Sequence, residues 1–163
     1  AGLTGRSVTH TGSYRVTFTS HFGVIAMAAA ERKTKYMDPP PPSEITDDLR
    51  IPVLHLWLEP QGDSAAVDGT IYLAASINHV VIRPEDRDEG VVQPLSFETE
   101  PVEFSNLLGA QFTSTRALAT FSAEGALAAS EDRDLEVVVI TPAGERRCNV
   151  DNDDIKRMFQ MDQ

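Results

Sequence analysis

Apolar and polar side chains alternate most clearly in the stretch SYRVTFT, residues 13–19. Tyr14, Val16 and Phe18 recur with a period of two and alternate with Arg15, Thr17 and Thr19. Successive side chains of a strand point to opposite faces of a sheet, so this period indicates a strand with one buried face. Aromatic and β-branched residues also favour strands. The stretch therefore predicts a half-buried β-strand.

The same alternation recurs in the stretch VLHLWL, residues 53–58, where three leucines form one face and His55 and Trp57 form the other. Further strand patterns, several of them separated by turn residues, occupy 69–75, 79–83, 91–97, 111–121 and 134–141. Strand signals at short intervals without regular intervening helices are typical of antiparallel packing. We therefore expect a mainly β fold, an antiparallel β-sandwich or barrel of about eight strands, with one or two short helices.

One of the short helices is expected near 101–109. Pro101 can occupy the first turn of a helix, and Gly109 can end it. Two other stretches, 23–36 and 117–130, carry both helix and strand signals. The first, for example, combines an alanine-rich composition with an apolar run short enough for a buried strand. The sequence leaves both stretches undecided.

A second short helix is expected at the C-terminal end, over 152–161. Asp151 or Asn152 can cap it, and acidic residues in its first turn suit the helix dipole. A helix this short is not stable alone in water, so its apolar stripe must be buried. The stripe consists of Ile155, Met158 and Phe159. We expect Phe159 to anchor the helix, either on its own domain or on a neighbouring subunit.

The patterns over 13–163 predict a single β domain. Residues 1–12 contain three glycines and few apolar side chains, so they are expected to form a flexible arm or an edge strand. Four consecutive prolines, residues 39–42, favour an extended polyproline conformation. They predict an exposed connector over 38–48.

The charges of the chain are unevenly distributed. Residues 1–36 contain five basic residues and one acidic residue, whereas residues 37–163 contain nine basic and 24 acidic residues. The net charge of −11 argues against a nucleic-acid partner, because phosphate binding needs clustered lysine and arginine. No apolar run approaches the ~18–20 residues that span a bilayer, so no membrane span is expected. The basic start of the chain, with Arg6 and Arg15, is expected to dock on an acidic protein face.

Four residues are candidate metal ligands: His55, His79, Asp86 and Asp88. The two histidines lie on different predicted strands that can become neighbours, and the two aspartates share one loop. However, the short histidine spacings of zinc sites are absent. Arg87, between the aspartates, would also repel a cation. We expect neither a metal nor another cofactor to be required.

The sequence offers no strong signal for covalent catalysis. It contains no Gly-x-Ser-x-Gly motif and no glycine-rich phosphate loop. The single cysteine, Cys148, excludes an internal disulfide and alternates with polar residues on a predicted terminal strand. We expect this thiol to be buried and structural.

These patterns favour a protein that binds proteins. Trp57 lies opposite the leucine face of its strand. Either both faces of that strand are covered, or Trp57 and His55 reach an interface or a ligand groove, and tryptophan is enriched at the centres of interfaces. The interface candidates are Trp57, Arg6, Arg15 and Phe159. We expect a non-catalytic assembly or protein-binding subunit of a homo-oligomer or larger particle, such as a virion, a filament or a secretion apparatus. The alternative is a small-molecule or metal-dependent enzyme or carrier with a site inside the β framework.

Overall fold

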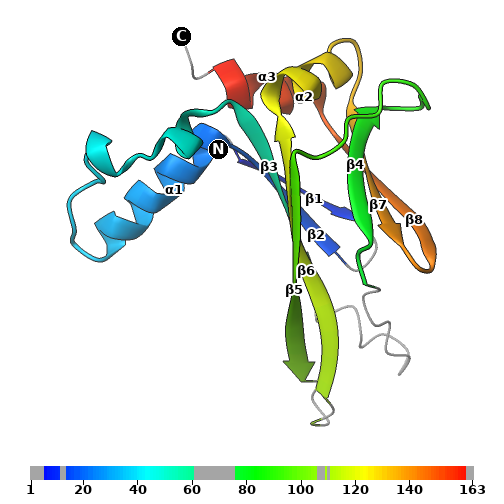
Figure 1. Ribbon diagram of the computed structural model, residues 1–163, viewed down its shortest axis with the longest axis horizontal. Coiled ribbons are helices and arrows are strands. Elements are labelled where there is room, and N and C mark those ends of the chain that lie inside the picture. Colours follow the sequence, from blue (N-terminus) through cyan, green and yellow to red (C-terminus); the bar gives the residue numbers. More distant parts are fainter. Residues whose placement is uncertain (1–5, 12–13, 61–75, 106–108, 110, 161–163) are drawn as a thin grey trace.

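A computed structural model describes residues 6–11, 14–60, 76–105, 109 and 111–160 (Figure 1). The strand predicted at 69–75 and the last residue of the helix predicted at 152–161 lie outside these residues. The described elements are, in chain order, β1 (Arg6–Thr11), β2 (Tyr14–Ser20), α1 (His21–Thr34), η1 (Pro42–Glu44), η2 (Asp47–Arg50), β3 (Val53–Pro60), β4 (His79–Pro84), β5 (Ser96–Ser105), β6 (Gln111–Ser122), α2 (Ala123–Ala129), β7 (Leu135–Thr141), β8 (Gly144–Val150) and α3 (Asn152–Gln160).

The first sheet contains the two alternating stretches, 13–19 and 53–58, in neighbouring strands. Its strand order is β1-β2-β3-β6-β5, and all neighbours are antiparallel. Phe18 lies opposite Leu56, and Leu56 lies opposite Ala119 on the next strand. These three side chains are fully buried on the inner face of the sheet. The predicted strands at 13–19 and 53–58 are therefore confirmed, and their apolar faces are buried as predicted. The other face of β2 is not exposed, however, because Thr17 and Thr19 are buried as well.

The second sheet contains three antiparallel strands in the order β4-β7-β8. Its inner face contributes Val80, Ile82, Val137 and Val139 to the same hydrophobic core as the first sheet. Within the described residues the two sheets do not close into a barrel, since each keeps its own end strands. The barrel that the sequence allowed is therefore not formed by the described residues. The prediction of a mainly β, antiparallel fold is confirmed.

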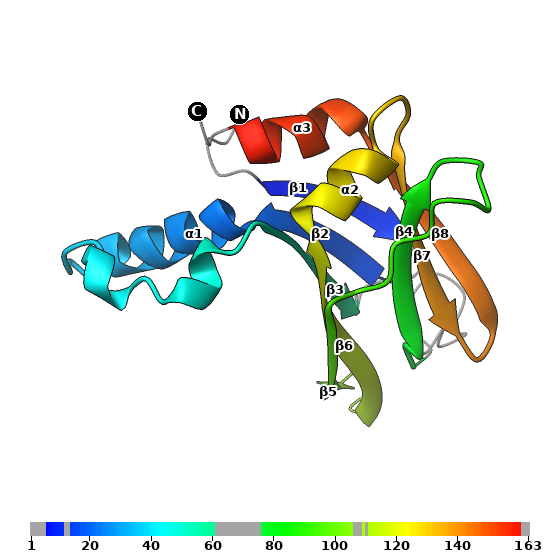
Figure 2. The same cartoon turned by 45° about the horizontal axis from the view of Figure 1, so that its top comes forward.

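The helices α2 and α3 lie together at one end of the sheets (Figure 2). Asp151 caps the start of α3, because its carboxylate accepts a hydrogen bond from the backbone N–H of Asp153 at 2.8 Å. The predicted stripe of Ile155, Met158 and Phe159 is buried in the core. The stripe thus packs within its own chain, which is the first of the two packing alternatives for Phe159.

The undecided stretch 23–36 is largely helical. Ser20 caps α1 by accepting a hydrogen bond from the backbone N–H of Gly23 at 3.3 Å. Near the other end, Lys35 pairs with Glu31 at 2.6 Å, and basic residues in the last turn suit the helix dipole. The helix extends away from both sheets in Figures 1 and 2. None of the described helices is long and apolar enough to cross a membrane.

The helix predicted at 101–109 is wrong. Residues 96–105 form β5, and Pro101 lies opposite Thr115 of β6. Because β5 is the outermost strand of its sheet, the missing N–H of the proline need not break the ladder. The predicted strand at 91–97 begins only at Ser96. The second undecided stretch, 117–130, divides into β6 and α2.

The predicted N-terminal arm is an edge strand where the structure describes it. Residues 6–11 form β1, which pairs with β2 along its whole length. The connector predicted at 38–48 contains the short 3₁₀ helix η1 and the start of a second one, η2, and is mainly exposed. It returns the chain from the tip of α1 to the start of β3.

Candidate protein-interaction site

The outer face of the five-stranded sheet carries two predicted site residues, His55 and Trp57. Both are half-buried, as expected for side chains opposite the leucine face. Nδ1 of His55 lies 3.2 Å from Oγ1 of Thr120. The indole Nε1 of Trp57 is buried and has no hydrogen-bond partner among the described residues. This face is therefore polar and aromatic, in contrast to the aliphatic inner face.

Burial lowers the pKa of His55 below its ordinary value of 6.5, and the nearby positive charge of His21 lowers it further. The unfolded chain consequently binds a proton at His55 more readily than the folded protein does. Stability from this group is complete above the ordinary pKa and is lost as the pH falls below it. We therefore expect a lower urea midpoint at about pH 5.5 than at about pH 7.5, measured by equilibrium denaturation.

The variant His55→Gln should reduce this pH dependence relative to the unaltered protein. An unchanged pH dependence in His55→Gln would contradict the assignment.

The candidate metal ligands are distributed over separate places. His79 is on β4 of the other sheet, where its Nε2 lies 2.8 Å from Oε1 of Gln93 and its ring meets Phe97 edge-on. Asp88 pairs with Arg83 at 3.1 Å, and Asp86 lies in the same loop. Within the described residues, no group of three or more histidine, cysteine, aspartate or glutamate side chains could hold a metal ion.

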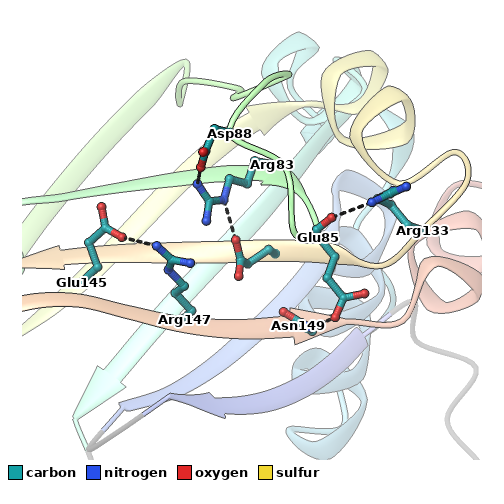
Figure 3. Close-up of polar contacts among 8 residues, drawn as sticks. Arg83, Glu85, Asp88, Arg133, Glu145, Arg147 and Asn149 are labelled. Carbon is teal, nitrogen blue, oxygen red and sulfur yellow. Dashed lines mark hydrogen bonds and ion pairs between the residues drawn. The ribbon is translucent and has the colours of Figure 1, made fainter.

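The outer face of the three-stranded sheet carries a network of charged side chains (Figure 3). At its centre, Arg83 donates from Nε to the carboxylate of Glu136 on the neighbouring strand, and both side chains are buried. Arg133 donates to the backbone carbonyl of Glu85 at 3.0 Å. The Arg83–Asp88 pair and a hydrogen bond from Asn149 of β8 to Glu85 attach the loop after β4 to the sheet. Sequence reasoning missed this network, because its members become neighbours only through the pairing of β4 with β7.

The thiol of Cys148 is buried on β8. Burial, followed by the negative charge of Glu136, raises its pKa to about 12. The thiol is therefore protonated at neutral pH and is a poor nucleophile.

The basic residues near the start of the chain are largely paired within it. Arg15 pairs with Glu59, and Arg32 pairs with Glu44 of the connector. Arg6 is in β1, and its side chain lies outside the described part. The early positive charges therefore lie on β1, β2 and α1 rather than on one continuous arm.

The element that does extend from the body is α1 with its return connector, residues 21–52, which we call the projecting arm. It carries five large apolar side chains that remain exposed. Their exposed fractions are 37% for Phe22, 43% for Met27, 100% for Tyr36, 54% for Met37 and 54% for Ile51. Contiguous exposed apolar patches on soluble proteins often mark contact surfaces, and these side chains are candidates for such a contact.

The apolar run at 23–30 lies in the stretch that the sequence leaves undecided between a helix and a buried strand, so sequence reasoning missed this surface. The run has the composition of a buried segment, and only the direction in which α1 leaves the sheet makes it accessible. Comparison with known proteins does not extend this result: no protein-family model, curated protein or solved structure matches the chain.

Proposed function

We propose that this chain is a non-catalytic assembly subunit, a β-sandwich body that associates with other proteins through its projecting arm. The observation that carries the proposal is the exposure of large apolar side chains along α1 and its return connector. Removing such side chains from water on association is favourable by roughly 25 cal/mol for each Å² of apolar surface.

The arm is also preorganised for docking. The Ser20 cap and the Lys35–Glu31 pair stabilise the two ends of α1. The Arg32–Glu44 pair holds the return connector against the helix. A partner therefore meets a formed helix, and little conformational entropy is lost on binding.

The surroundings of the candidate catalytic and metal-binding residues support this proposal. The thiol of Cys148 is buried and protonated, and Asp88 is paired with Arg83. His79 contacts Gln93 and Phe97 rather than His55. These contacts favour structural roles over the alternative of an enzyme or carrier.

The central prediction is that Met27→Glu abolishes self-association. Met27 is exposed, so glutamate is compatible with the folded monomer, but its charge would be buried in an interface at a large cost. We expect the molar mass of the unaltered protein, measured by light scattering, to rise with concentration. The variant should keep the monomer mass of 17.8 kDa throughout.

Gln111→Glu provides the control, because it adds the same charge at an exposed position on β6. Circular dichroism would verify that both variants remain folded. A protein that is monomeric at all concentrations, or a Met27→Glu variant that associates as the unaltered protein does, would contradict the proposal.

A further inference from the structure

The chain turns sharply where α1 ends. Two backbone hydrogen bonds make this turn: the N–H of Tyr36 donates to the carbonyl of Lys33 at 3.1 Å, and the N–H of Met37 donates to that of Arg32 at 2.9 Å. This pair of bonds forms a Schellman motif, whose turning residue has a left-handed backbone and is usually glycine. Here the turning residue is Tyr36, with a φ of 55°. A bulky side chain holds this conformation at a cost that glycine avoids.

The ring of Tyr36 does not pack on the protein. Its side chain is 100% exposed, and that of Met37 beside it is 54% exposed. Core packing therefore gives no reason for an aromatic residue at a turn that suits glycine. Strained backbone positions are typical of segments that bind other molecules. Contact with another molecule would give this ring a use.

The prolines that follow, residues 39–42, form an extended segment. Three of them are exposed, and Pro40 is half-buried. Pro41 has φ −65° and ψ 156°, close to the values of a polyproline II helix. Each proline ring fixes its own φ and also favours an extended backbone at the residue before it. The segment therefore keeps its shape in the free protein, and little conformational entropy is lost when it is bound.

The first half of this segment has unused hydrogen-bond acceptors. The carbonyls of Pro41 and Pro42 accept hydrogen bonds from the N–H groups of Glu44 and Ile45, at 2.9 and 3.3 Å. Among the described residues, no donor reaches the carbonyls of residues 39 and 40. Aromatic-lined grooves bind extended proline segments of this kind, and their tryptophan and tyrosine side chains also carry hydrogen-bond donors.

The segment is accessible and carries one charge. Figures 1 and 2 show the turn after α1 and the start of the connector at the far left, away from both sheets. A partner can therefore reach it without meeting the β body. Asp38, directly before the prolines, is exposed and forms no ion pair with any residue that the structure describes. A basic side chain beside the groove would complement it.

A second copy of the chain does not offer such a groove in its described part. The exposed aromatic side chains there are Phe22 and Tyr36, and both belong to the projecting arm itself. The indole of Trp57 is half-buried on its sheet. We infer that residues 36–42 are the ligand of a different protein, a domain with an aromatic-lined groove and a basic residue at the Asp38 end. This contact goes beyond the proposed function and does not depend on self-association.

The test titrates the intact, isotope-labelled chain with isolated domains of three polyproline-binding classes, SH3, WW and EVH1. We expect at least one class to shift the amide NMR signals of residues 36–38 and to leave those of β7 unchanged. Pro39→Ala combined with Pro40→Ala releases the fixed backbone and should raise the Kd by about tenfold or more. Pro142→Ala is the control, because it changes an exposed proline in the turn between β7 and β8.

Tyr36→Gly separates binding from stability. Glycine suits the left-handed turn, so the urea midpoint should stay the same or rise, whereas the affinity for the domain should fall because the exposed ring is lost. An affinity that is unchanged in this variant would remove Tyr36 from the contact and overturn the inference as stated.

Two other results would overturn it. One is the absence of signal shifts with all three classes at about 1 mM domain, and the other is a Kd that the double proline variant does not change. The double variant should self-associate as the unaltered protein does, and Met27→Glu should still bind the domain. Failure of this inference and failure of the proposed function are therefore distinguishable.

Discussion

Phe159→Ala is expected to lower the free energy of unfolding by about 3 kcal/mol or more, the usual cost of emptying a large aromatic site in a core. Phe159 is 8% exposed and shares the buried stripe of α3 with Ile155 and Met158, which are 0% and 2% exposed. A helix of this length persists only while that stripe is buried. Urea denaturation of the variant, followed by circular dichroism, measures the effect.

Gln160→Ala is the matched control, since its side chain is exposed at the next position of the same helix. Its free energy of unfolding should change by no more than about 0.5 kcal/mol. The packing of α3 on its own core predicts that Phe159→Ala weakens the monomer rather than the assembly. Dissociation of the oligomer with unchanged monomer stability would contradict that packing.

Glu136→Ala is expected to lower the free energy of unfolding by about 3 kcal/mol. Breaking a buried ion pair commonly costs about 3–5 kcal/mol, because the remaining charge is left without its partner. The side chains of Arg83 and Glu136 are only 11% and 7% exposed. The lower end of that range applies because Asp88 still pairs with Arg83 at 3.1 Å. Urea denaturation at neutral pH measures this loss.

Two further variants identify the cause. Replacing both partners, Arg83→Met with Glu136→Leu, should restore most of the lost stability, since no charge is then left buried. Glu145→Gln breaks an exposed pair with Arg147 on the same sheet and should have no measurable effect. A double variant that is as unstable as Glu136→Ala would show that packing, and not the isolated charge, explains the loss.

Local patterns predicted the elements whose structure depends on alternation or capping. The period of two at 13–19 and 53–58 gave both the strands and their buried faces, and the apolar stripe of α3 predicted its docking. These predictions succeeded because the signal and its cause lie within a few residues. The opposite faces of Leu56 and Trp57 were predictable for the same reason.

The predictions that failed depended on tertiary position. Pro101 is typical of the first turn of a helix, but a proline is equally acceptable on an edge strand, and only the strand order places β5 at the edge. His55 and His79 could have been cross-strand neighbours, but their strands belong to different sheets. The exposure of Met27 likewise depends on the direction of α1, which no local pattern records.

Hydrogen–deuterium exchange of the intact chain, at low and at high concentration, tests the central claim most directly. An exposed helix opens locally and exchanges quickly, whereas burial of its apolar side chains in an interface suppresses that opening. We predict that raising the concentration slows amide exchange in peptides covering 22–34. Exchange in peptides covering the exposed Gln111 of β6 should not change. Unchanged exchange in α1 while the molar mass increases would contradict the claim that this protein assembles through its projecting arm.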